Sequence, residues 1–241
     1  MVSTVGLREL PRRIGRFASS WIVAAPCTHI YLLVLLVTTE TVRSLHPVLA
    51  SQLLRQVSTN LNEMGRSAGR VLFLSAFLLD DGQWGKQVVL FTLVYVPLER
   101  WAGSLRWLSV VIAGHVGATI ATTVGIWADA RSNRGTFELT HSIDVGVSYG
   151  FFAAAAFLTF GLRRRWIRAT SLAVLFAALV GALLDHHTFT NAGHVAALCI
   201  GVAMYLVLSP GLRNRPSVST GSRSRSLLRS SGASPGPSGT G

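Results

Sequence analysis

The sequence predicts an all-α membrane protein in which six helices cross a bilayer as one bundle. Half of the 241 residues are hydrophobic and only 13% are charged, whereas charged residues make up about a quarter of an ordinary soluble domain. The apolar residues gather in stretches that approach the roughly 20 residues needed to cross the hydrocarbon core. Positive residues gather in alternate connections between these stretches, which is typical of cytoplasmic loops.

Five of the six stretches are nearly continuous, and the second is interrupted. In the second, an apolar run begins at Val71, but Asp80, Asp81 and Lys86 break it before the apolar residues resume. We therefore place this span at residues 87–97 together with the flank upstream of them. The six predicted spans are 21–40, 87–97 with that flank, 105–127, 145–162, 166–184 and 191–208.

The distribution of charge predicts the side that each connection faces. Fifteen of the 22 Lys and Arg residues lie before the first span, between spans two and three, between spans four and five, or after the last. Because positive residues accumulate on the cytoplasmic side, we expect a multi-pass protein of the cell membrane with both termini in the cytoplasm. Most of the net charge of +12 then reflects topology and attraction to anionic lipid, so nucleic acid is not an expected partner.

Three parts follow along the chain. Residues 1–20 form a basic cytoplasmic N-terminus, and residues 21–209 form the membrane domain. Residues 210–241 are mostly Ser, Gly, Pro and Arg, which cannot bury enough apolar surface to fold, so we expect a disordered basic cytoplasmic tail. Within the membrane domain, the external segment 43–70 alternates Leu and Val with polar residues. It is either an amphipathic helix at the interface or a small ordered insertion packed on the bundle.

Ionisable side chains at membrane depth are costly and indicate functional sites; here they are His29, Glu40, His115 and His194, and we add the hydroxyl of Ser148. Spans four and six both start on the outer side. Ser148 lies four residues after Asp144, and His194 lies four residues after Thr190. At about 1.5 Å per residue, both side chains are expected at the same depth, roughly 6 Å below the outer boundary.

Small residues recur every four positions on the same two spans and allow helices to approach closely in lipid. A Ser hydroxyl is a weak nucleophile until a base within about 3 Å takes its proton, so this packing favours a Ser148/His194 dyad. The alternative is that both side chains only bond a backbone carbonyl or each other. The small residues are Gly146, Gly150 and Ala154 on span four, and Gly193, Ala197 and Gly201 on span six.

The remaining histidines have two interpretations. His29 and His115 are either core histidines bonded to a neighbouring helix, or ligands for haem or a metal. No two histidines on a single span stand at ligand spacing. We therefore expect no metal and no cofactor.

Three motifs resemble the rhomboid intramembrane serine proteases, and more closely the rhomboid-like membrane proteins of actinobacteria, over residues 67–210. They are Gly146-Val-Ser148, Asn191-Ala-Gly-His194 with the small residues that follow it, and Glu99-Arg-Trp-Ala-Gly103-Ser. The resemblance implies a six-transmembrane-helix rhomboid-like bundle, with Ser148 as nucleophile and His194 as general base. It also implies that Phe152 flanks the imidazole, where the family more often has Tyr.

Three positions depart from the family pattern. The usual Gly-x-Ser-Gly reads Gly-Val-Ser-Tyr, so Tyr149 places bulk beside the nucleophile. The second-helix His and Asn of the family fall on Gln83 and Gln87, which, with Ser148, are the candidates for stabilising an oxyanion. Losing one oxyanion donor lowers the rate about 10²- to 10³-fold.

The function expected from this resemblance is hydrolysis of peptide bonds in membrane-anchored substrates by the Ser148/His194 dyad. The partners would be the lipid bilayer and transmembrane protein substrates. One alternative is a catalytically inactive rhomboid-like protein that binds transmembrane clients. A second is a membrane carrier or redox protein that uses His29, His115 and His194.

Overall fold

The computed structural model describes residues 21–57, 61–79, 84–131, 147–185 and 189–213, and within these ranges every regular element is an α-helix. The predicted all-α class is confirmed for this part of the chain. The helices are α2 (Pro26–Ser44), α3 (Pro47–Val57), α4 (Leu61–Ser75), α5 (Trp84–Ala102), α6 (Ser104–Arg131), α7 (Val147–Gly161), α8 (Arg165–Asp185) and α9 (Phe189–Arg213).

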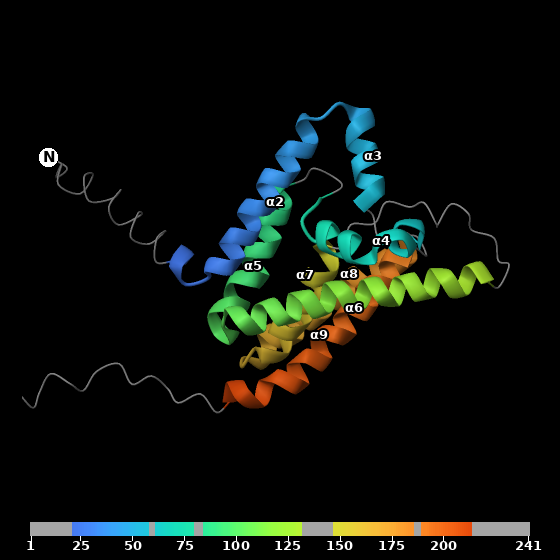
Figure 1. The fold of residues 1–241 in the computed structure, drawn as a ribbon. Coiled ribbons are helices and arrows are strands. Elements are labelled where there is room, and N and C mark those ends of the chain that lie inside the picture. The colour runs from blue at the N-terminus through green and yellow to red at the C-terminus, as the bar shows by residue number, and fades with distance from the viewer. Residues whose placement is uncertain (1–20, 58–60, 80–83, 132–146, 186–188, 214–241) are drawn as a thin grey trace, which may run out of the picture.

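Helix α7 is the central element of the bundle. It packs most extensively against α9 and α6, while α8 has fewer contacts with its neighbours, and α2 runs beside α5 (Figure 1). The middle of α7 is the run of four alanines from Ala153 to Ala156, all of them buried. Because small side chains let helices approach closely in lipid, this run suits a helix that has neighbours on several sides.

The second predicted span differs from the observed helices. Val71 is fully buried near the end of α4, and α5 begins separately at Trp84. Helix α5 contains the predicted segment 87–97 and the residues just upstream of it, and the apolar run from Val71 belongs to α4 and the residues that follow it. Leu78 and Leu79 of that run are also buried, whereas Phe73 is exposed.

Two described helical stretches, Ser104–Ala128 and Thr190–Ser209, are long and apolar enough to cross a membrane. Val147–Gly161 is apolar but has only 15 residues, about 22 Å at 1.5 Å per residue, against roughly 30 Å of hydrocarbon. The count of six spans stays a prediction.

The segment that follows α2 folds as two helices, α3 and α4. Leu54 of α3 packs with Val42 and Leu78 in a small separate apolar cluster. The end of α4 is bonded to α6, because the Nε2 of His115 lies 2.8 Å from the Leu72 carbonyl oxygen. Within α4 the backbone leaves helical geometry at Ser67. The segment therefore lies against α6 at its C-terminal end.

A buried carboxylate joins the start of α2 to the end of α5. Glu99 is 2% exposed, and its oxygens accept hydrogen bonds from the N–H groups of Cys27 and Thr28 at 3.0 and 2.8 Å and from the hydroxyls of Thr28 and Ser104, both at 2.7 Å. The first N–H groups of a helix have no acceptor within that helix, so Glu99 supplies the acceptor that α2 lacks.

Gly103 makes the turn from α5 to α6. Its φ of 90° lies in the left-handed region that favours glycine, and its N–H donates to the Glu99 carbonyl at 2.8 Å. This is the usual way in which a glycine after the last helical residue ends a helix. The Glu-x-x-x-Gly-Ser motif thus fixes α2, α5 and α6 at one junction.

Candidate active site

The structure brings Ser148 and His194 together. Ser148 lies in the first turn of α7, His194 lies in the second turn of α9, and both are half-buried. The Ser148 Oγ and the His194 Nε2 are 2.9 Å apart, within the range of a hydrogen bond in which a hydroxyl donates to an imidazole nitrogen. As described, α7 begins at Val147 and α9 at Phe189, close to the predicted starts of spans four and six.

Two aromatic rings hold the imidazole of His194. The ring centroid of Phe152 lies 4.4 Å from that of His194 at an interplanar angle of 41°. The ring of Tyr149 meets His194 edge-on, with centroids 5.5 Å apart, and Tyr149 is fully buried. Rings at these distances make favourable aromatic contacts and limit the rotation of the imidazole beside Ser148.

Small residues bring α7 and α9 into close contact near Ser148 and His194. A Cβ added at Gly193 would lie 2.5 Å from the ring of Tyr149, and one added at Gly201 would overlap the backbone of Ala153. Ala197 is fully buried. Three small residues of α9 therefore lie against neighbouring elements, and at Gly193 and Gly201 a side chain would collide with α7.

The small residues of span four have other partners. A Cβ at Gly150 would lie 2.9 Å from the side chain of Val111, so this glycine faces α6 rather than α9. Gly146 lies outside the described residues. The close approach to α9 comes instead from Ala153, which also faces Gly114 of α6.

Of the three residues predicted to stabilise an oxyanion, the structure describes two. Gln83 lies outside the described residues, and Gln87 is half-buried on α5. Ser148 lies in the first turn of α7, where backbone N–H groups have no acceptor within their own helix. The N–H of Ser148 is therefore the described group that is best suited to donate to an oxyanion beside its own Oγ.

A second Ser/His pair differs chemically from the first. The Ser75 Oγ lies 3.4 Å from the Nε2 of His115, but the same nitrogen lies 2.8 Å from the Leu72 carbonyl oxygen. Because a carbonyl oxygen only accepts, this Nε2 carries the proton and cannot take one from Ser75. His115 therefore ties α4 to α6, whereas the Nε2 of His194 faces a hydroxyl that can donate to it. His115 is recognisable from sequence as an ionisable residue at membrane depth, but its pairing with Ser75 is not, because the pairing depends on how α4 packs against α6.

His29 and Glu40, the other ionisable residues predicted at membrane depth, bond residues of their own neighbourhood. The Nδ1 of His29 lies 2.7 Å from the Ala25 carbonyl oxygen, and Glu40 pairs with Arg43 at an exposed position, 2.9 Å apart. In the ranges that the structure describes, no group of three or more His, Cys, Asp or Glu residues is arranged to hold a metal ion. His29, His115 and His194 do not converge on one site, since each bonds a different partner.

The comparisons with known proteins give a family. The family described as "Rhomboid-like protein" matches residues 20–214, a range that contains every described helix. No curated protein and no solved structure matches the chain. The predicted resemblance to rhomboids is confirmed, and the match also takes in α2 and α3, which precede the resembling region. The chain therefore belongs to the rhomboid-like protein family and is a membrane protein of the rhomboid type.

Proposed function

We propose that this protein is a serine-type endopeptidase that hydrolyses peptide bonds of membrane-anchored substrates. The observation that carries the proposal is the 2.9 Å contact between the Ser148 Oγ and the His194 Nε2. A nucleophile and a base within hydrogen-bond reach are the minimum for acyl transfer. The contacts of the Phe152 and Tyr149 rings with the imidazole support it, because they limit the rotation of the base beside Ser148.

The reaction would proceed in two halves. The Ser148 Oγ attacks the carbonyl carbon of the scissile peptide while its proton passes to the Nε2 of His194, and the carbonyl oxygen becomes an oxyanion. The protonated imidazole then gives its proton to the leaving amine, and an acyl-Ser148 ester is left. Water, deprotonated by His194, attacks this ester and releases the carboxylic acid, and the hydroxyl of Ser148 is restored.

The oxyanion would be held by backbone at the start of α7. The N–H of Ser148 lies in the first turn, and the partial positive charge of a helix N-terminus favours an anion there. Gln83 and Gln87 are candidates for a further amide donor. Because each donor contributes about 10²- to 10³-fold in rate, the activity of this chain depends strongly on whether one of these amides reaches the site.

The same proposal includes a topology. Six spans with both termini in the cytoplasm of the cell would place Ser148 and His194 near the outer face of the cell membrane. A substrate must present extended backbone to Ser148, so a transmembrane segment that unwinds easily near that face is the expected substrate class.

The decisive experiment uses the two Ser/His pairs as test and control. The purified full chain is treated with a fluorophosphonate probe and incubated with a model transmembrane substrate. Ser148→Ala and His194→Gln should abolish labelling and cleavage, whereas Ser75→Ala and His115→Gln should retain both if the variants stay folded. Equal cleavage by the wild type and Ser148→Ala would refute the proposal.

The second candidate function is binding of transmembrane clients without hydrolysis. It is favoured by Tyr149, which stands beside Ser148 where the family usually has Gly, and by the replacement of both usual oxyanion donors by Gln83 and Gln87. A wild-type protein that captures a client peptide by photo-crosslinking, and that neither reacts with the probe nor cleaves the peptide, would establish this function instead of the first.

A further inference from the structure

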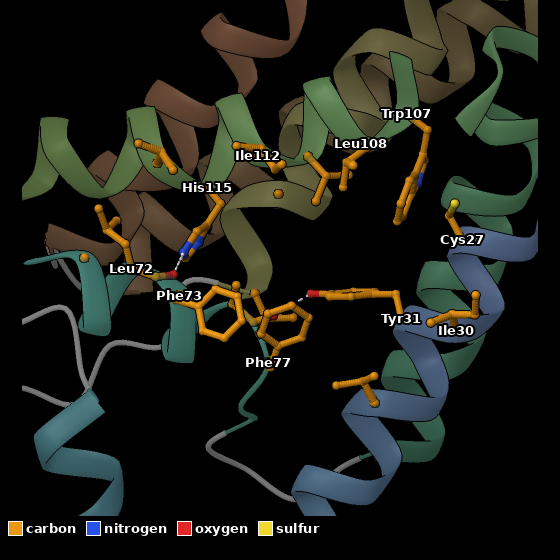
Figure 2. A pocket seen from close by; sticks show the side chains of 17 residues that line it. Cys27, Ile30, Tyr31, Leu72, Phe73, Phe77, Trp107, Leu108, Ile112 and His115 are labelled. Atoms are coloured by element: carbon orange, nitrogen blue, oxygen red, sulfur yellow. Dashed lines mark hydrogen bonds between the residues drawn. The ribbon is translucent and has the colours of Figure 1, made fainter. Parts of the chain in front are cut away.

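A large apolar cavity lies beside the first turn of α7. Its volume is about 570 Å³, and it opens between α2, α4 and α6 (Figure 2). We propose that this cavity binds one acyl chain of a membrane phospholipid. Six of the residues that line it are Tyr31, Val34, Phe73, Phe77, Trp107 and Ile112.

The size of the cavity selects the occupant. A membrane-spanning helix is about 10 Å wide and about 30 Å long, which corresponds to a cylinder of roughly 2,400 Å³. The cavity of about 570 Å³ is too small for such a helix, but it lies within the range of about 300–1,000 Å³ that small ligands occupy. A single hydrocarbon chain therefore fits where a transmembrane client does not.

Two polar side chains of the cavity wall, Tyr31 and His115, are bonded to the protein itself, while the Nε1 of Trp107 has no hydrogen-bond partner among the described residues. The hydroxyl of Tyr31 donates to the Ala76 carbonyl at 2.8 Å, and the Nε2 of His115 donates to the Leu72 carbonyl at 2.8 Å; both bonds are drawn in Figure 2. Among the described residues that line the cavity there is no Lys or Arg. A free fatty acid would therefore bring a carboxylate without a cationic partner, whereas a phospholipid chain can enter and leave its headgroup outside.

The rim of the cavity faces the surroundings of the protein. Four large apolar residues from three helices line the cavity and are also exposed: Ile30 is 62% exposed, Phe73 65%, Leu108 42% and Ile112 51%. In a membrane protein such an apolar surface contacts lipid. The opening is therefore continuous with the hydrocarbon from which an acyl chain would come.

The inner end of the cavity reaches the helix that carries Ser148. Val147 and Gly150, which lie on either side of Ser148 in α7, line it together with Val111 of α6. A chain in the cavity would contact α2, α4, α6 and the first turn of α7 at once. It would fill the space between α2 and α6, which touch each other only slightly.

The test is photo-labelling of the full chain in phosphatidylcholine nanodiscs that contain a phosphatidylcholine with a diazirine on its acyl chain. Adducts are mapped by mass spectrometry. In the wild type, lining residues such as Phe73 and Ile112 should be labelled several-fold more than Val124 and Leu206, which are similarly exposed but do not line the cavity.

Matched variants distinguish lipid bound in the cavity from lipid that contacts the surrounding apolar surface. Val34 lines the cavity, and its neighbour Leu33 is 60% exposed outside it. Val34→Trp should lower labelling of the lining residues several-fold, and Leu33→Trp should leave it unchanged. Ala76, which follows α4, also lines the cavity, and Ala76→Phe should act as Val34→Trp does.

Three outcomes would overturn the proposal. They are equal labelling of lining and non-lining positions in the wild type, equal effects of Val34→Trp and Leu33→Trp, and displacement of the lipid adducts by a transmembrane client peptide. None of them depends on cleavage or on Ser148, so failure here is distinguishable from failure of the proposed protease function.

Discussion

Substituting Gly193 by Ala tests the contact that holds α9 against the candidate active site. The added Cβ would lie 2.5 Å from Cε1 and Cζ of Tyr149 and 2.6 Å from its Oη. Carbon atoms that are not bonded sit at about 3.5–4.0 Å, so the ring must withdraw by about 1 Å or more. Tyr149 is fully buried, so this movement displaces its neighbours.

The expected loss of stability follows from overpacking. Forcing a buried side chain aside costs about 1–3 kcal/mol of unfolding free energy. For a chain of this size each kcal/mol corresponds to roughly 2–4 °C in Tm, so Gly193→Ala should lower the Tm of the purified protein by about 2–12 °C. Because Tyr149 rests on His194, labelling of Ser148 by a fluorophosphonate should also fall, by about 10²-fold if the imidazole moves 1 Å.

Two controls make the experiment specific. Gly181 lies on α8 with no atom within 4 Å of an added Cβ, so Gly181→Ala should leave labelling unchanged and raise stability by about 0.5–1 kcal/mol, as Ala does in a helix. Tyr149→Leu removes the three atoms in conflict, so adding Gly193→Ala to it should have little further effect. A Gly193→Ala protein with wild-type Tm and labelling, or a loss that persists beside Tyr149→Leu, would refute the argument.

Three further predictions concern the helix junction and α4. Glu99→Gln should lower the unfolding free energy by about 1–3 kcal/mol, because at least one buried donor loses its acceptor. Thr28→Val removes one hydroxyl bond and should lower the unfolding free energy by about 1 kcal/mol. Equal thermal melts for both variants and the wild type would exclude the role given to the Glu99 carboxylate. Gly103→Ala should cost about 1–2 kcal/mol, since a left-handed φ disfavours a side chain, and an unchanged Tm would contradict the turn. His115→Phe should speed hydrogen exchange in α4 while fluorophosphonate labelling of Ser148 is kept; loss of labelling in a folded variant would show that His115 also acts at the site.

Much of the candidate site was accessible from sequence. Ser148 and His194 could be paired because both stand near the start of apolar stretches that run in the same direction, and because small residues follow each of them. Phe152 followed from the rhomboid resemblance. Gly150 shows the limit of this reasoning, because a periodic small residue indicates a close helix contact without indicating which helix makes it, and here the contact is with α6.

The sequence by itself determined the class of the protein. Long apolar stretches with few charges are compatible only with structures whose backbone polar groups are satisfied internally, and helices do this within one segment. The tertiary structure decided which chemistry each polar side chain can perform. Ser75/His115 and Ser148/His194 look alike as residue pairs, but the Nε2 of His115 is bonded to the Leu72 carbonyl, whereas the described partner of the Nε2 of His194 is the Ser148 hydroxyl. Glu99 meets Thr28 across 71 positions for the same reason: hydrogen bonds between distant residues depend on how the helices pack, and a pattern along the chain does not contain that information.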